Sequence, residues 1–162
     1  MKASAVKGMP VLSLTEGARV GNLRDVLLDT AALRVTMLLL STPDGESLVP
    51  FEKIRSIGAD AITIESTSAT EGTTGQAAVT GQRAVGELMG LAVTSAEGTH
   101  LGDVKDLEFD AKDGRLIEIG LHKGGVLGIG GTSLTVPASA IRSFGPKLVA
   151  VDIPAVEGDA SR

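Results

Sequence analysis

The stretch EGARVGNLRDVLLD, from Glu16 to Asp29, decides the fold, because a second version of it, EGTHLGDVKDLEFD, runs from Glu97 to Asp110. Each copy is followed by a strand-like run and then by another matching block, LVPFEKIRSIGADAITIE at 48–65 and LTVPASAIRSFGPKLVAVD at 134–152. Self-similarity of this kind is the signature of tandem structural units. The chain of 162 residues therefore divides into two modules of roughly 75 residues each.

The apolar residues of the repeated stretch do not alternate strictly. They are Val20, Leu23, Val26 and Leu28 in the first copy, and Leu101, Val104, Leu107 and Phe109 in the second. Two breaks in the alternation are typical of a coiled strand with bulges, which lets a small sheet curl. An amphipathic helix is the competing interpretation, since a spacing of three also suits a helix. The flanking glycines and β-branched neighbours favour the strand.

The remaining elements of each module are also predicted to be strands. They are 35–41 and 61–64 in the first copy, and 116–122 and 148–151 in the second. Asp113-Gly114 is a strong hairpin signal, and Pro50 and Pro137 suit the first position of a single helical turn. Gly21 and Gly102, equivalent glycines inside the long strand, predict a bend or a close backbone approach.

These patterns predict an all-β fold of two tandem small, strongly bent antiparallel β-barrels, each with at most a short helical turn. The first module is expected at 1–65 and the second at 87–153, with residues 1–7 as a short lead-in. Residues 66–86 are rich in Ser, Thr, Gly and Ala, which predicts a flexible linker. Residues 154–162 have no periodicity and are expected to form a flexible tail.

The ordered motifs resemble those of the PRC-barrel family. They are E-G-x-x-(V/L)-G-x-(V/L)-x-D, then a D-x-x-x-(G)-R turn, then V-P-x-x-x-I-x-S-(I/F)-G, and they occur twice, within Gly8–Glu65 and Leu88–Asp152. The family includes the cytoplasmic domain of the photosynthetic reaction centre H chain and the C-terminal domain of a ribosome maturation factor. The resemblance implies small bent barrels used mainly as platforms for protein contacts. It supplies no catalytic residues, and the chain looks most like stand-alone bacterial or archaeal members.

Composition disfavours several kinds of partner. The net charge is −5, both halves carry more acids than bases, and there is no run of Lys or Arg, so direct binding of nucleic acid or an anionic membrane is not expected. Trp and Tyr are absent and the three Phe lie in apolar patterns, which argues against base stacking. The chain has no Cys and no apolar run long enough for a bilayer, so we expect a cytoplasmic protein without membrane insertion.

Several polar residues are candidates for chemistry. Asp25 and Asp106 are equivalent, and we expect each to accept backbone N–H groups left unpaired at a bulge. A cluster of acids could be a calcium site, but it lacks the EF-hand order and suits a solvated strand face: Asp103, Asp106, Glu108, Asp110 and Asp113. His100 and His122 lie in no metal motif and are interpreted as turn or surface residues, with a pH-sensing role left open.

A glycine-rich connection between two strands of the second copy is the candidate partner-binding site. Its residues are Lys123, Gly124, Gly125, Val126, Leu127, Gly128, Ile129, Gly130 and Gly131. Such a loop can present N–H groups to an anion, but it has no phosphate-binding motif. It also fits a plain hairpin connection; if it has a function, contact with a protein partner is the first expectation.

The sequence therefore predicts a non-enzymatic protein–protein interaction or assembly module that needs no cofactor or metal. A module of this size buries only about 60% of its surface, so packing against the other module or a second copy would add stability, and a homodimer is expected. The alternative is a ribosome-maturation or RNA-processing accessory factor that binds through a ribosomal protein. A small-molecule- or metal-regulated enzyme, supported only by the acidic cluster, is a third hypothesis.

Overall fold

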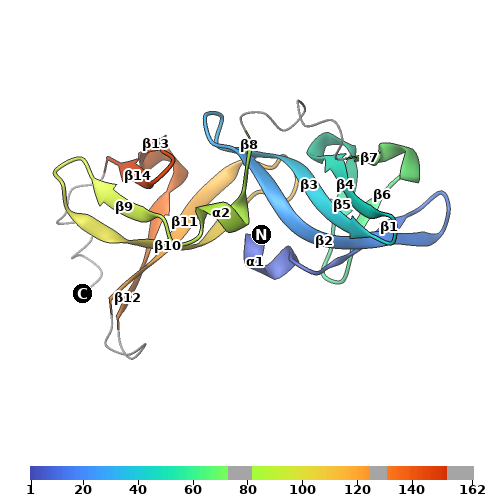
Figure 1. Ribbon diagram of the computed structural model, residues 1–162, viewed down its shortest axis with the longest axis horizontal. Helices are drawn as coiled ribbons and strands as arrows, with labels where there is room; N and C mark the ends of the chain where they lie inside the picture. Colours follow the sequence, from blue (N-terminus) through green and yellow to red (C-terminus); the bar gives the residue numbers. More distant parts are fainter. Residues whose placement is uncertain (73–81, 125–130, 153–162) are drawn as a thin grey trace.

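The computed structural model describes residues 1–72, 82–124 and 131–152, and these form two curled sheets side by side (Figure 1). The first module contains helix α1 at Ala3–Val6 and the strands β1 Pro10–Ser13, β2 Ala18–Asp29, β3 Arg34–Thr42, β4 Gly45–Pro50, β5 Ile54–Ile57, β6 Ile62–Ile64 and β7 Glu71–Gly72. The second contains β8 Gln82–Ala84, helix α2 Val85–Leu88 and the strands β9 Ala92–Ser95, β10 His100–Phe109, β11 Leu116–Lys123, β12 Thr132–Pro137, β13 Ile141–Phe144 and β14 Leu148–Val151. The all-β prediction is confirmed.

Both sheets have the same strand order, which is seen when the second is followed from its last strand, β13, to β12. The first runs β5-β6-β1-β2-β3-β4-β7, with β8 also paired to β2, and the second runs β12-β11-β10-β9-β14-β13. One pair in each sheet is parallel, β1 with β6 and β9 with β14, which corrects the expectation of purely antiparallel barrels. The cause is the connection after β4 and β12. There the chain passes through a 3-10 turn, Phe51–Lys53 or Ala138–Ala140, and does not fold back as a hairpin. The next hairpin, β5–β6 or β13–β14, therefore brings the last strand alongside β1 or β9 in the same direction.

The long strands β2 and β10 carry the predicted bulges. Strand β2 has one extra residue at Val20 against β1 and another at Arg24 against β3, and β10 has extra residues at Leu101 against β9 and Lys105 against β11. Each bulge turns the next apolar side chain back to the concave face. All the apolar residues named for these strands are buried except Val20, which is half-buried. The strand interpretation is confirmed and the helix is excluded.

The glycine at the bend of each long strand lies against the neighbouring strand, as predicted. A Cβ at Gly21 would overlap the carbonyl oxygen of Ser41, and one at Gly102 would lie 3.0 Å from the carbonyl oxygen of His122. Only a residue without a side chain allows this approach.

The linker prediction, 66–86, is too wide at both ends. Residues 67–69 form a 3-10 turn whose Ala69 is buried, and β7 then pairs with β4. On the other side, β8 pairs with β2 and α2 follows it directly. A small residue such as Ala69 is compatible with a flexible linker, but here it lets the chain pack closely on the first module. Residues 73–81, and the tail predicted at 154–162, lie outside the described residues.

Candidate functional site

The ends of the two modules cross over at their junction. Strand β8, which leads into the second module, pairs with β2 of the first, with Ala84 opposite Leu27. Lys2, at the start of the first module, pairs with Glu108 of β10 in the second module. The Met1 amine and carbonyl both bond to the backbone of Phe109 at 2.9 Å. Each long strand is therefore paired along one side with a segment that begins the other module.

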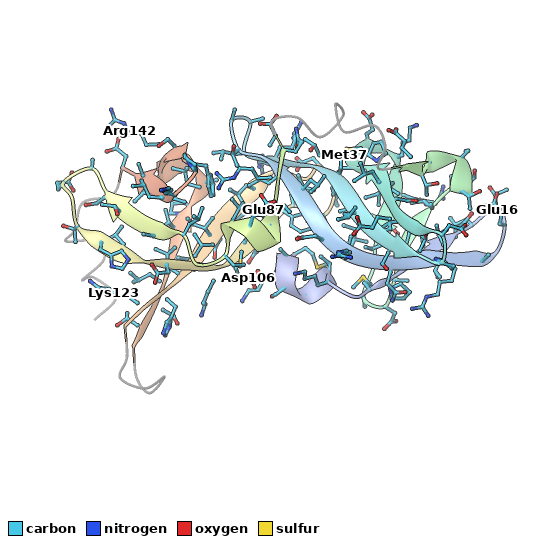
Figure 2. The ribbon with its side chains drawn as sticks, viewed as in Figure 1. Glu16, Met37, Glu87, Asp106, Lys123 and Arg142 are labelled. Atoms are coloured by element: carbon cyan, nitrogen blue, oxygen red, sulfur yellow. The ribbon has the colours of Figure 1, made fainter. Side chains whose placement is uncertain are left out.

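Asp25 and Asp106 fasten this crossing. Each accepts the N–H of the next residue at its bulge, at 2.7 Å for Asp25 and 2.8 Å for Asp106, as the sequence predicted. Each also reaches the short helix of the other module. Asp106 accepts the N–H of Ser4 at 3.1 Å and its hydroxyl, and Asp25 accepts the N–H of Gly86 at 3.2 Å. Figure 2 shows Asp106 beside the start of α1.

Sequence reasoning missed this junction because it treated residues 1–7 as a lead-in. The signal was present: Ala3, Val6 and Gly8 recur with the same spacing as Val85, Leu88 and Gly90. Both helices bury these apolar residues. Each helix is followed, two residues after its end, by a glycine with positive φ, 84° at Gly8 and 85° at Gly90. The repeat therefore starts before the first strand of each module.

Side chains of both modules also share one core. A single cluster of buried residues draws from both sheets, including Leu38 of β3 and Ile119 of β11. The rings of Phe51 and Phe109, one from each module, meet edge to face with centroids 6.3 Å apart at 84°. Leu33 and Leu116 are joined by a backbone hydrogen bond of 2.9 Å. The two repeats form one body.

The predicted partner-binding loop lies at the end of a long hairpin. Strands β11 and β12 pair without interruption from Glu118 opposite Pro137 to Lys123 opposite Thr132, and they project from the rest of the molecule (Figure 1). At the base of the loop Gly124 and Gly131 have positive φ, 66° and 89°. A Cβ at Gly131 would lie 2.8 Å from the His122 ring. Residues 125–130 of the predicted site lie outside the described residues.

A groove of about 250 Å³ runs beside this hairpin on the outer face of the second sheet. Its lining combines cations and acids with uncharged residues of β10, β11 and β12: Lys2, Lys105, Asp106, Leu107, Glu108, Glu118, Gly120, Ser133, Leu134 and Thr135. Lys105 donates to the Ser133 hydroxyl at 3.1 Å. No feature of the sequence analysis had singled this groove out.

The same face is apolar in the first module. There Leu27, Met37 and Leu48 form a small buried cluster (Met37 is labelled in Figure 2). Their positions correspond in the repeat to Glu108, Glu118 and Thr135. Leu39, which packs against that cluster, corresponds to Gly120. The groove exists because the second copy has shorter or charged side chains where the first has three leucines and a methionine.

The acidic cluster is divided among separate structural roles. Asp103 contacts His100 at 3.1 Å, Asp106 holds α1, and Glu108 lines the groove. Asp110 accepts the N–H of Lys112, which holds the pKa of its carboxyl below the ordinary value, and Asp113 accepts the N–H of Arg115.

Within the described ranges, no three His, Asp or Glu side chains are grouped as a metal site. The structure therefore gives no support to the calcium hypothesis. His122, the second histidine of the chain, pairs with Ser133 on the β11–β12 hairpin and is exposed.

The family model of the PRC-barrel domain matches the chain twice, over residues 1–71 and 81–157. The chain belongs to the PRC-barrel family. The two matches cover both repeats, so the protein is a tandem PRC-barrel protein. A comparison with curated proteins found no match.

The family match includes both crossing segments. Residues 1–7 and 82–88 fall inside the two matched ranges, so the first and second PRC-barrel modules each begin with the helix that contacts the other module. Among the described residues, no helix combines the length and apolar character needed to cross a membrane.

Proposed function

We propose that this tandem PRC-barrel protein is a non-enzymatic interaction or assembly module that acts in the cytoplasm. The observation that supports the proposal is the β11–β12 hairpin, which projects from a body whose two halves already satisfy each other's cores. A projecting hairpin with a groove at its side offers a partner both backbone and side-chain contacts.

The argument for a homodimer changes with the structure. A module of this size was expected to gain stability by packing against the other module or a second copy, and the other module supplies such packing within one chain. Self-association is therefore proposed through the hairpin and its groove, and not through a shared core.

The first module supplies a template for the test. Its corresponding hairpin closes with Pro43-Asp44 between the paired residues Thr42 and Gly45. Replacing residues 124–131 by Pro-Asp, between the paired Lys123 and Thr132, removes the loop and keeps the strands. The matched control changes the turn of the other hairpin: Pro43-Asp44 is replaced by Asn-Gly, a turn of the same length that suits a hairpin.

Two measurements follow. Light scattering over a range of concentrations should show a dimer for the natural chain and the control, and a monomer for the shortened loop. In affinity capture from the protein's own cells, the natural chain and the control should recover the protein partner, and the shortened-loop variant should not. The proposal would be contradicted if the natural chain stayed monomeric and if the natural chain and the shortened-loop variant captured the same proteins. Ribosomal proteins among the captured proteins would favour the accessory-factor role.

A further inference from the structure

Two arginines face each other where the modules meet. Arg34, the first residue of β3, and Arg115, just before β11, are joined as an isolated antiparallel bridge. Backbone hydrogen bonds of 2.7 Å and 2.9 Å flank the bridge, and they join Val35 to Gly114 and Leu116 to Leu33. Bonds on both sides, and none between the arginines themselves, define a non-hydrogen-bonded pair, in which the Cα atoms lie about 4.5 Å apart and the side chains are close.

Both arginine side chains point away from the core. Val35 and Leu116, the residues that follow them, are buried, and successive side chains of a strand point to opposite faces. Arg34 and Arg115 are accordingly exposed. Like charges directly opposite each other on one face of a sheet are destabilising. The position is therefore one where a negative charge between the two side chains would be favourable.

The acids beside the pair are used by their own turns. Asp29 is paired with Arg34, and the Asp110 N–H donates to the Arg115 carbonyl at 2.8 Å. Each of these two carboxylates accepts backbone N–H groups of the turn that follows it, at distances from 2.7 to 3.0 Å. The ion pairs found among the described residues include neither arginine.

The arginine pair has two-fold character. Arg34 and Arg115 end the same D-x-x-x-(G)-R turn of the two repeats, so the bridge joins equivalent residues. Contact between equivalent residues is the mark of an isologous interface, in which both sides supply the same patch. The exchanged bonds of Asp25 with α2 and of Asp106 with α1 follow the same relation. A ligand at this point meets the same group from each module.

A cavity of about 430 Å³ opens beside Arg34. Residues of both modules line it: Arg34, Val35, Thr36, Phe51, Glu52, Ile54, Lys112 and Asp113. Lys112 is a further cation, and it comes from the second module. Of the two acids, Asp113 already accepts the Arg115 N–H at 2.9 Å. The cavity has space for a small organic group next to an anion held by the arginines.

We propose that Arg34 and Arg115 together bind a phosphate group at the junction of the modules. Each guanidinium presents its N–H donors as a planar fork that matches phosphate oxygens. Free inorganic phosphate and a phosphate monoester share this chemistry, and the organic part of a monoester would enter the cavity beside Arg34. The proposal goes beyond the proposed function, because it assigns a small anion to the junction and holds whether or not the hairpin binds a protein.

The sequence limits which other parts of the chain compete for the arginines. Residues 73–81 and 125–130, outside the described ranges, contain no Asp or Glu, whereas the segment 153–162 carries Glu157 and Asp159. A chain that ends at Asp152 therefore belongs in the test.

The test is an NMR titration with sodium phosphate at neutral pH, followed at the arginine Nε–H signals. Sodium chloride of equal ionic strength serves as the blank. The natural chain is compared with Arg34→Gln, Arg115→Gln and the chain that ends at Asp152. The matched control is Arg55→Gln, which removes the same charge from an exposed arginine already ion-paired with Glu65 at 3.2 Å.

In the natural chain, the shortened chain and the control, phosphate should shift the signals of both arginines along one saturable curve. Either glutamine variant at the pair should bind about tenfold more weakly, the effect of losing a charge-assisted hydrogen bond. A second titration uses glycerol phosphate. Tighter binding with new amide shifts at Phe51 and Ile54 identifies a monoester as the preferred ligand, and equal binding without them identifies free phosphate.

The proposal would be overturned if phosphate caused no saturable shift beyond that of chloride, or if Arg55→Gln weakened binding as much as Arg34→Gln. Binding seen only in the shortened chain would also overturn it, and would assign the arginines to the acids of 153–162.

Thermal unfolding gives a second measurement. Without phosphate and at low salt, Arg34→Gln should melt no lower than the natural chain, because it removes the repulsion between the arginines. Phosphate should raise the melting temperature of the natural chain and not that of the variant, since a ligand of the native state stabilises it. A variant that melts several degrees lower without phosphate would contradict the proposal, because the arginines would then stabilise the junction by themselves.

Discussion

The edge-to-face contact of Phe51 and Phe109 gives a direct prediction about the junction of the modules. Phe51 is 8% exposed and Phe109 is 1% exposed, and their centroids are 6.3 Å apart. An aromatic pair of this geometry contributes about 0.5–1.5 kcal/mol beyond the area that it buries. Changing either residue to leucine keeps much of the buried volume and removes this contribution.

The assay is a double-mutant cycle of Phe51→Leu and Phe109→Leu. The chain has no Trp or Tyr, so urea unfolding should be followed by circular dichroism. Because the second substitution removes a contact that the first has already broken, the double variant should be less destabilised than the sum of the two single variants, by about 0.5–1.5 kcal/mol. The control cycle pairs Phe109→Leu with Ile62→Val, on β6 of the first module, and should be additive.

The result that would refute this reasoning is additivity within about 0.3 kcal/mol for the two phenylalanines. It would mean that the rings do not meet in solution and that the modules are not packed as described. Coupling of the same size in the control cycle would also count against it, because the coupling would then not be specific to the ring contact.

Three other predictions concern single residues. Leu107→Asp places a charge at a side chain that is 2% exposed and should lower the free energy of unfolding by several kcal/mol, about 3 or more; an unchanged urea midpoint would show that the inside and outside of β10 are reversed. Gly21→Ala should destabilise the protein more than Gly58→Ala, whose Cβ would make only an ordinary contact at 3.4 Å, and equal melting temperatures would contradict the close approach. The Ser13 hydroxyl and then the Thr67 N–H lower the pKa of Glu16, so its stabilising effect is present above the ordinary pKa of a glutamate and is lost as the pH falls through the lowered value; Glu16→Gln should therefore flatten the acid side of a stability–pH curve, and identical curves would refute it.

Much of the fold could be predicted because the sequence expresses it locally. The two breaks in alternation between Val20 and Val26 correspond to the two bulges of β2, and the same holds between Leu101 and Leu107 in β10. A bulge changes which face each following side chain takes, so it leaves a trace in the order of apolar residues. The close approaches at Gly21 and Gly102 were predictable for the same reason.

The crossing of the ends was not predicted, because it depends on partners far away in sequence. A residue such as Ser4 looks unremarkable until Asp106 is placed beside its N–H. The parallel pairs were missed because the direction of a returning strand depends on whether the connection after β4 reverses the chain. The groove was predictable in part: comparing Gly120 with Leu39 shows where the second copy is hollowed, but not what surrounds the hollow.

The most direct test of the central claim, that the two repeats form one body, is urea unfolding followed by NMR at equivalent buried residues. Leu38 in the first module and Ile119 in the second belong to the same core cluster. Their native signals should disappear together at one urea midpoint, because each module completes the packing of the other. Two separate midpoints, with one module still folded after the other has unfolded, would contradict the account.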